Sequence, residues 1–239
     1  MKAAGNLKIP TILIGNFTWY DIYSHFPEAK NETHLIQSLA EEYSHSTLQI
    51  LPQCHLDNKI IHHKKEVGFI ANKGKNMRND LVSFLGKKAE KKILVFIYLG
   101  EHGTRKVNLS NLRNNKDCLF LTRDPIKHPD VHFIDDKFSY HDLIASSDIT
   151  LTKGGYSTLA TSFANHKPVI TCERDDFYEF KAVREYLQKR QIGIIVKSAP
   201  FKQGDWQEPI KEALKLTVKN KVPLNGEIEI AKIVQQMLS

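Results

Sequence analysis

The chain of 239 residues has no long apolar segment and little cysteine. No run approaches the roughly 18 apolar residues that a membrane-spanning helix needs. Its three cysteines, Cys54, Cys118 and Cys172, are odd in number and widely spaced, which fits a reducing compartment better than a disulfide framework. The first apolar run is about six residues long and no small-residue cleavage pattern follows it, so the sequence predicts no signal peptide. We therefore expect a cytoplasmic protein.

The composition is that of a globular protein, with 41% hydrophobic and 26% charged residues and a formal net charge of +7. Basic residues concentrate between residues 60 and 92, around one expected helix that contains a single aromatic residue, Phe84. A nucleic-acid interface needs basic residues together with aromatic or base-reading partners, and we expect none. Two interpretations remain for this segment, a solvated surface or peripheral contact with an anionic surface at the inner face of a membrane.

Short apolar runs alternate with amphipathic stretches along most of the chain. The runs "ILVFIYLG" and "KPVITC" are apolar on successive residues, as in strands of a parallel sheet that are buried on both faces. The pattern predicts an α/β fold with a Rossmann-like, doubly wound parallel sheet. Strands are expected at Ile93–Tyr98, Cys118–Thr122, Val131–Phe133, Ile149–Thr152, Val169–Cys172 and Gly193–Val196, and helices at Lys106–Asn114, Tyr140–Ser146, Ser157–Asn165, Phe177–Lys189, Asp205–Val218 and Ile228–Leu238.

The regular pattern covers only part of the chain, and three segments are expected. Residues 1–58 contain two strands, Thr11–Phe17 and Thr47–Pro52, which are too few for an independent sheet. We interpret this segment as a partial amino-terminal α/β segment, the end of a domain. Residues 59–91 are a basic linker with one helix, and residues 92–239 form the Rossmann-like domain.

Three conspicuous stretches follow expected strands. They are "YLGEHGTR" after the first strand of the regular domain, "TKGGYST" after a later one and "CERDDFYEF" after the next. In an open parallel sheet, ligands bind beyond the carboxyl ends of the strands. All three stretches are therefore expected at the edge where a ligand would bind.

The stretch "TKGGYST" has the features of a phosphate site. Gly154 and Gly155 let the backbone approach a ligand without a Cβ atom in the way. The helix that follows offers unsatisfied N–H groups and the positive end of its dipole. Lys153 and Arg174 are placed to add positive charge. The alternative is a bare connection between a strand and a helix.

The segment "FIDDKFSYHDLIASSDITLTKGGYSTLATSFANHKPVI…RDDFYEF" resembles the carboxyl-terminal, donor-binding domain of GT-B glycosyltransferases. The resemblance is to the family 28-like branch that contains the N-acetylglucosaminyltransferase making lipid II. "IPTILIGNFTWYDIY" resembles the end of the amino-terminal domain in GT-B-like proteins, including the portion attached to plant arabinokinases. The resemblance implies binding of a nucleotide-diphosphate sugar, usually a UDP-sugar, and hexosyl or N-acetylhexosaminyl transfer without a metal or another cofactor.

Residue roles follow from the same resemblance. Phe133 and Ile134 would lie against the base, glycines would surround the diphosphate, and the carboxylates of Asp176 and Glu179 would reach sugar hydroxyls. The implied donor-binding set is Gly100, Gly103, Phe133, Ile134, Lys153, Gly154, Gly155, Tyr156, Ser157, Thr158, Thr161, Arg174, Asp176 and Glu179.

The sequence departs from the family pattern in two respects. Thr161 stands where the family usually has a glutamate that binds the ribose, so nucleotide affinity is expected to be lower or the nucleotide different. The larger part of the amino-terminal domain, which carries the acceptor site and usually the general base, has no counterpart. No catalytic residue is therefore assigned, although His102 in the glycine loop is placed to meet a phosphate or a sugar.

Three hypotheses follow. The first is a donor-binding half that needs a partner subunit carrying the acceptor domain, and we adopt it. The second is a non-catalytic relic or interaction module, for which an exposed apolar edge and poor solubility are expected. The third is an enzyme like the nucleotide-sugar 2-epimerases.

The set Cys54, His55, His62 and His63 has no compact metal-ligand spacing, and we interpret it as surface or linker residues. We interpret Cys172 as a buried, inert thiol.

Overall fold

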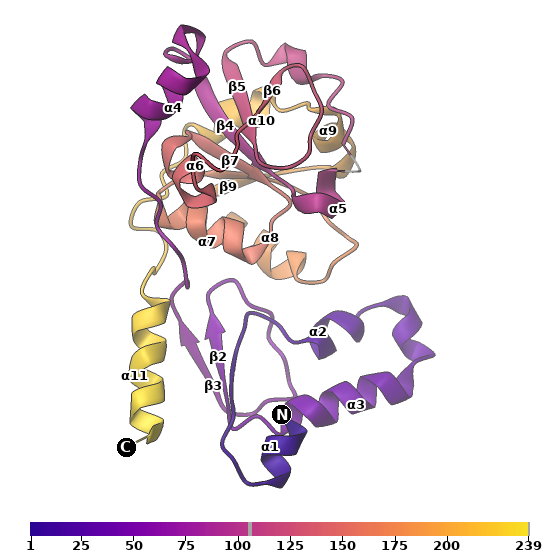
Figure 1. Cartoon of the computed structure of the whole chain (residues 1–239). Helices are drawn as coiled ribbons and strands as arrows, with labels where there is room; N and C mark the ends of the chain where they lie inside the picture. The colour runs from indigo at the N-terminus through magenta and orange to yellow at the C-terminus, as the bar shows by residue number, and fades with distance from the viewer. Residues whose placement is uncertain (105–106, 239) are drawn as a thin grey trace. The chain divides into compact units, whose positions relative to one another are not determined.

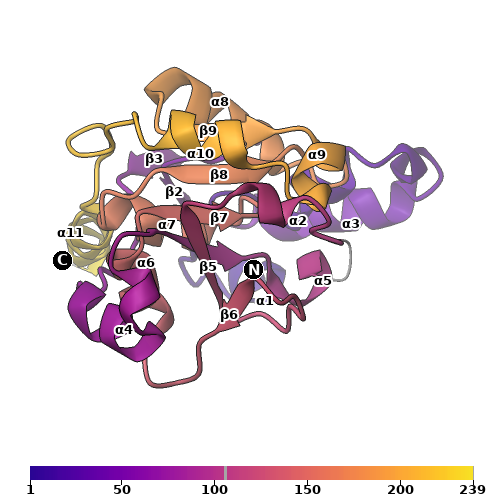
Figure 2. The ribbon, with the colours of Figure 1, turned by 90° about the horizontal axis from the view of Figure 1, so that it is seen from above.

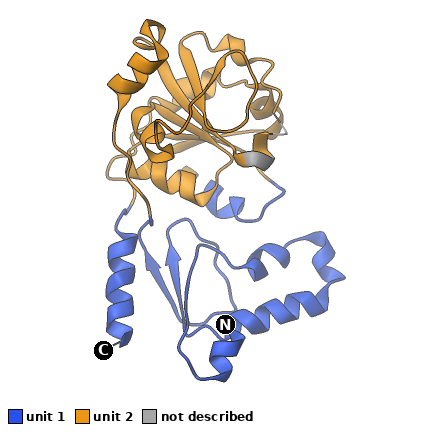
Figure 3. Cartoon of the chain, in the orientation of Figure 1, with its two compact units in different colours: residues 1–70, 175–186, 223–239 blue, residues 71–174, 187–222 orange. Residues whose placement is uncertain are grey.

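The computed structural model describes residues 1–104 and 107–238, which form two compact units. Unit 1 consists of Met1–Ile70, Asp175–Tyr186 and Pro223–Ser239, and unit 2 of Ala71–Arg174 and Leu187–Val222 (Figure 3). Two segments from the second half of the chain therefore belong to unit 1 together with the amino-terminal residues. The sequence analysis, which divides the chain into consecutive segments, does not predict this arrangement.

Unit 2 contains a six-stranded parallel sheet in the order β6-β5-β4-β7-β8-β9, which can be followed in Figure 2 from β6 at one edge to β9 at the other. The strands are β4 (Ile93–Tyr98), β5 (Cys118–Thr122), β6 (Val131–Phe133), β7 (Ile149–Thr152), β8 (Val169–Cys172) and β9 (Gly193–Val196). All six have the bounds that the sequence predicts. The Rossmann-like α/β class is therefore confirmed.

The two faces of this sheet carry separate hydrophobic clusters. On one face Trp206 and Phe201 pack with Phe120 and the strand residues around it, and on the other Phe96 packs with Leu81 and Phe138. Helices connect or flank the strands at α4 (Arg78–Leu85), α5 (Gly100–Thr104), α6 (Tyr140–Ser146), α7 (Tyr156–Ala164), α8 (Phe180–Arg190), α9 (Ser198–Gln203) and α10 (Gln207–Ala213), with 3-10 turns η2 (Lys87–Ala89) and η3 (Leu112–Asn114). Burial of both faces explains the continuous apolar runs of the strands.

Two expected helices of unit 2 are shorter than the pattern predicts. The one expected over Asp205–Val218 forms only as α10. The sequence predicts a helix over Lys106–Asn114, of which Lys106 lies outside the described residues and only η3 forms. Leu109 adopts φ of +54°, and its N–H donates to the carbonyl of Lys202 at 3.1 Å. Hydrogen bonds to α9, itself not anticipated, replace the helical ones here.

Unit 1 contains a three-stranded parallel sheet, β1 (Ile12–Ile14), β2 (Leu48–Pro52) and β3 (Lys64–Val67), in that order. The remaining elements are α1 (Lys2–Asn6), α2 (Trp19–Tyr23), η1 (Pro27–Lys30), α3 (Thr33–Ser44) and α11 (Gly226–Leu238). Strand β3 lies where the sequence predicts only a linker with one helix. Its residues, "KKEV", are mostly charged and exposed, so no apolar pattern marks it.

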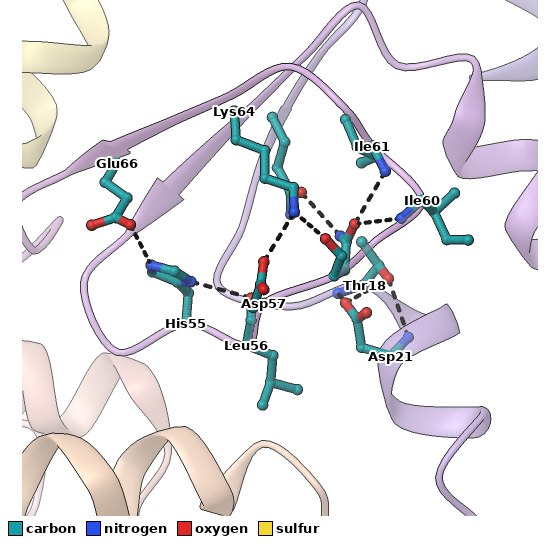
Figure 4. Close-up of polar contacts among 11 residues, drawn as sticks. Thr18, Asp21, His55, Leu56, Asp57, Ile60, Ile61, Lys64 and Glu66 are labelled. Atoms are coloured by element: carbon teal, nitrogen blue, oxygen red, sulfur yellow. Dashed lines mark hydrogen bonds and ion pairs between the residues drawn. The ribbon is translucent and has the colours of Figure 1, made fainter.

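The loop between β2 and β3 is closed by polar contacts (Figure 4). Asn58 donates to Gln49 Oε1 at 3.0 Å, and its own Oδ1 accepts from the backbone N–H groups of Ile60 and Ile61. Lys64 Nζ donates to Asp57 at 3.0 Å. These bonds fix the residues that lead into β3.

The long carboxyl-terminal helix α11 packs on the unit 1 sheet. Ile230 and Ile233 lie against a cluster of β1, β2 and β3 residues, and α11 runs beside β3 (Figure 1). Gly68 donates its N–H to Glu229 Oε2 at 2.7 Å. A Cβ atom on Gly226 would overlap the carbonyl oxygen of Gly68, so the start of α11 requires glycine there.

We therefore predict that Gly226→Ala destabilises unit 1 by about 2 kcal/mol, since the backbone of Gly68 cannot move aside without losing its bond to Glu229. Hydrogen exchange of the β2 amides, followed by mass spectrometry, measures the effect. Gly15→Ala is the matched control in the same unit, because its added methyl group would make only ordinary contact, 3.4 Å from Phe17 O. Equal exchange in the two variants would contradict the prediction.

Candidate functional site

The strand order of unit 2 reverses at β4. From β4 the chain proceeds outward through β5 and β6 on one side, and then through β7, β8 and β9 on the other. The connections that leave the carboxyl ends of β4 and β7 therefore diverge, and open α/β sheets bind ligands at this switch point. The Gly100 turn follows β4 and the Lys153–Gly155 turn follows β7.

These two turns lie beside one another. Lys153 Nζ is 3.3 Å from the position that a Cβ atom of Gly100 would occupy. Gly100 and Gly154 have φ of +70° and +87°, a conformation that favours glycine. Gly154 donates its N–H to Thr152 Oγ1 at 3.3 Å, and Gly155 is the N-cap of α7 with an ordinary φ of −69°. In each turn, therefore, the backbone conformation at one position, Gly100 or Gly154, accounts for a glycine there.

A hydrogen bond between two hydroxyl groups ties the first turn of α7 to α6. Tyr140 Oη, from the start of α6, donates to Thr158 Oγ1 at 2.8 Å. Burial raises the pKa of the Tyr140 phenol above its ordinary value. Ser157 is exposed and Thr158 is buried. An oriented helix amino end beside a lysine is an arrangement that suits an anion.

Asp124, two residues after β5, is part of this site and was not anticipated. Its Oδ2 accepts from the backbone N–H groups of Leu99 at 2.5 Å and of Gly100 at 3.1 Å. Thr122 Oγ1 accepts from the N–H of Asp124 at 2.9 Å and donates to the carbonyl of Ile97 at 3.0 Å. The Asp124 carboxylate is 4% exposed and therefore holds the Gly100 turn from inside the fold.

The surroundings of Asp124 act on its charge in opposite directions. Burial raises the pKa of this carboxyl, while the bonds from Leu99 and Gly100 and the charge of Lys153 lower it, and the net effect is a raised pKa. In the sequence, "LTRDP" is an ordinary strand end. The only signal for Asp124 in the sequence is its place just after the carboxyl end of an expected strand.

The two residues implied to meet the base differ in exposure. Phe133 ends β6 and is 60% exposed, whereas Ile134 is fully buried in a core cluster and donates its N–H to Thr122 O at 2.8 Å. Any contact with a base at this edge therefore falls to Phe133 and to the backbone.

Thr161 and Gly103 are explained by packing. Thr161 is 3% exposed within α7. A Cβ atom on Gly103 would lie 2.9 Å from Leu99 Cβ, so this glycine lets α5 approach the end of β4. Neither residue needs a ligand to account for its place in the fold.

The acidic residues implied to reach the sugar lie in the segment that belongs to unit 1. Asp176 is exposed, and Glu179 is buried and accepts from Asn16 Nδ2 at 2.7 Å. Arg174 is half-buried at the end of unit 2. His102 lies in α5, and its side chain is outside the described part of the structure. The sugar-binding roles of Asp176 and Glu179 stay predictions.

The cysteine and histidine residues do not gather. Within the described residues, no group of three or more His, Cys, Asp or Glu side chains could hold a metal ion. His55 pairs with Glu66 at 3.7 Å, and burial raises the pKa of the Cys54 thiol to about 12. Cys172 is buried at the end of β8. None of the helices in the described part of the chain is both long and apolar enough to cross a membrane.

Known proteins share this fold. No family model matches the chain. It is 23% identical over 239 residues to the L-arabinokinase of Arabidopsis thaliana, and the match covers 98% of the chain but 23% of that enzyme's length. The calicheamicin glycosyltransferase CalG4 superposes with a TM-score of 0.62 at 12% identity, over 99% of this chain and 70% of its own. The spinosyn rhamnosyltransferase SpnG, complexed with its aglycone, gives 0.63 at 13% identity, over 100% and 70%.

At such low identities the solved structures show the fold alone. The chain is a Rossmann-like α/β protein with the fold of these glycosyltransferases. SpnG has also been solved with thymidine diphosphate, with a TM-score of 0.60 to this chain. The finer resemblance to the lipid II branch stays a prediction.

The bonds of Asp124 lead to a prediction about stability. Asp124→Ala is expected to destabilise unit 2 by about 2 kcal/mol, because it leaves the buried N–H of Leu99 and that of Gly100 without an acceptor. Asp124→Asn should restore most of the loss, since both bonds end on one oxygen that an amide also provides. Urea unfolding followed by the fluorescence of the buried Trp206, in a Trp19→Phe background, measures both. An equal loss of unfolding free energy in Asp124→Ala and Asp124→Asn would contradict this prediction.

Proposed function

We propose that this chain is the donor-binding part of a GT-B hexosyl or N-acetylhexosaminyl transferase and that unit 2 holds a nucleotide-diphosphate sugar, in particular a UDP-sugar. The proposal rests on one observation, the pair of positive-φ glycine turns, with Lys153 between them, at the switch point of the sheet. This arrangement offers a diphosphate close backbone approach, a helix amino end and one fixed positive charge.

The base and the ribose of the nucleotide would extend from the two glycine turns toward β6. Phe133, at the carboxyl end of β6, is an exposed apolar surface that suits a flat base. The complex of SpnG with thymidine diphosphate supports a nucleoside diphosphate as the ligand class of this fold. Because Thr161 is buried and carries no carboxylate, the ribose would be held less firmly than by the glutamate of the family pattern.

The same groups would serve the transfer step. As the sugar leaves, negative charge grows on the diphosphate, and the amino end of α7 together with Lys153 would stabilise it. We therefore propose transfer without a metal ion. His102 stays a candidate for contact with the phosphate or sugar, and the proposal names no general base.

Unit 1 supports the need for a further acceptor domain or partner subunit. Most of the large apolar side chains that are exposed belong to this unit: Leu7, Ile9, Ile14, Trp19, Tyr23, Leu35, Ile70, Ile228, Met237 and Leu238. Helix α3 is amphipathic yet has no buried residue, and β1 is an edge strand with Ile14 exposed. These exposed apolar side chains are available to a partner that would cover them. A relic of the fold would expose the same surface, so activity rather than exposure separates the two hypotheses.

Nucleotide binding by the purified chain is the first test. We expect UDP, UDP-glucose and UDP-N-acetylglucosamine to bind with affinities between roughly micromolar and millimolar in calorimetry, and GDP to bind more weakly. Gly154→Ala should weaken binding at least tenfold, because a methyl group at φ of +87° displaces the turn. Gly86→Ala is the matched control, with φ of +84° and open space around its added methyl group.

A second variant tests the same site without backbone strain. Gly155 has an ordinary φ, and its added Cβ atom would meet only Lys153 Cε at 3.9 Å, so Gly155→Trp should fold and fill the space above the turn. Its loss of binding is expected to be complete. If no nucleotide binds to the wild-type chain, or if Gly154→Ala and Gly86→Ala bind alike, the donor site is not where we propose.

Turnover distinguishes a donor half from a complete enzyme. We expect the isolated chain to bind a UDP-sugar but to release no UDP from it, with or without simple glycosyl acceptors, because no side chain that the structure describes at the site is placed as a general base. A coupled assay for UDP release measures this. Release abolished by Gly155→Trp would show instead that the chain is active alone.

A further inference from the structure

The proposed donor site contains a negative charge as well as positive ones. The carboxylate of Asp124 caps the Gly100 turn from below, with both backbone bonds on Oδ2. The N–H of Gly100 is therefore directed at a carboxylate and is not available to a phosphate oxygen. A dianionic diphosphate that reaches Lys153 has to approach this carboxylate, because Lys153 Nζ lies 3.3 Å from the Cβ position of Gly100.

Few charged groups surround Asp124 in the part of the structure that is described. From the turn after β7 comes Lys153, and from α6 the phenol of Tyr140, both of which interact electrostatically with the carboxyl. From its own connection come the uncharged Thr122 hydroxyl and the backbone of Ile126, whose N–H donates to Asp124 O at 2.7 Å. The side chains of α5 that precede Gly103 lie outside the described residues. Lys153 is thus the one described cation that faces this carboxyl.

We propose that Asp124 makes donor binding proton-coupled: the charged carboxylate competes with the diphosphate for Lys153, and Asp124 takes up a proton when the diphosphate binds. This inference rests on the proposed function and adds its regulation by pH. The bonds to Leu99 and Gly100 remain in the protonated state, because a carboxylic acid keeps an oxygen that accepts hydrogen bonds.

Electrostatics gives the direction of the effect. A diphosphate bound at Lys153 places negative charge close to Asp124, and like charges at such distances disfavour ionisation. Burial already disfavours the charged form of this carboxyl and raises its pKa in the free chain. Binding of an anion must raise the pKa further, and by linkage the affinity must rise as pH falls through the range in which Asp124 titrates.

Calorimetry in paired buffers measures the proton directly. The probe is UDP-glucose, because its bridging diphosphate does not itself titrate in weakly acidic solution. Titrations in two buffers of different ionisation enthalpy, run from weakly acidic to neutral pH, report the protons taken up per ligand bound. For the wild-type chain we expect net uptake and an affinity that increases from neutral to acidic pH.

The variant that isolates Asp124 is Asp124→Asn, which keeps an acceptor for both backbone bonds and removes the charge. It should bind UDP-glucose about tenfold more tightly than the wild type at neutral pH, since a like charge at close range is gone. Its proton uptake should fall to near zero, and its affinity should lose most of its dependence on pH. A purely structural role of Asp124 would change none of these quantities in this direction.

Asp148→Asn is the matched control. Asp148 also accepts a backbone N–H of β4, that of Leu94 at 2.8 Å, but at the opposite end of the strand. This variant should keep the proton uptake of the wild type. Uptake that persists in Asp124→Asn, or an equal or weaker affinity of that variant, would overturn the inference while leaving the donor site intact. If the wild-type chain and both variants fail to bind UDP-glucose, the proposed function itself fails.

Discussion

The end of the central strand β4 has to be satisfied by hydrogen bonds, and the Asp124 carboxylate does this for two successive N–H groups. Unpaired buried N–H groups are costly, so a strand that ends at the switch point of a sheet needs an acceptor from a neighbouring strand. Asp124 lies two residues after β5, the strand next to β4, and the Thr122 hydroxyl fixes its backbone. This one side chain therefore holds the Gly100 turn, beside which Lys153 Nζ lies.

The glycines of the chain perform two different tasks. Gly100 and Gly154 adopt positive φ and shape the two turns of the candidate site. Gly68 and Gly226 cross at the start of α11, where any side chain would overlap a backbone. The first pair belongs to the site in unit 2 and the second to the packing of unit 1. Substitutions at the two pairs are therefore expected to have separate consequences, one for binding and one for stability.

The sequence predicts the sheet of unit 2 well because burial on both faces leaves no Asp, Glu, Lys or Arg in its six strands. Short, continuous apolar runs such as "ILVFIY" and "VITC", flanked by turns and amphipathic helices, are typical of strands in a parallel sheet. The same rule explains the missed strand β3, which is mostly charged and pairs at an edge. Asp124 could not be recognised from "LTRDP", because its role depends on the register of β5 against β4, a contact between residues distant in sequence. Likewise, nothing local to α11 indicates that it packs beside β3.

The two units differ in how completely they bury their apolar residues, and this bears on how the proposed activity is divided. Unit 2 has a two-sided core, with Trp206 and Phe96 fully buried on opposite faces of its sheet. In unit 1 an amphipathic helix has no buried residue, and apolar side chains of β1, α2 and α11 are exposed. A core that is complete within one unit can hold a pre-organised site without help from elsewhere. We therefore expect the proposed donor binding to be retained by the isolated chain, whereas the proposed acceptor step would need a partner that covers the apolar side chains of unit 1.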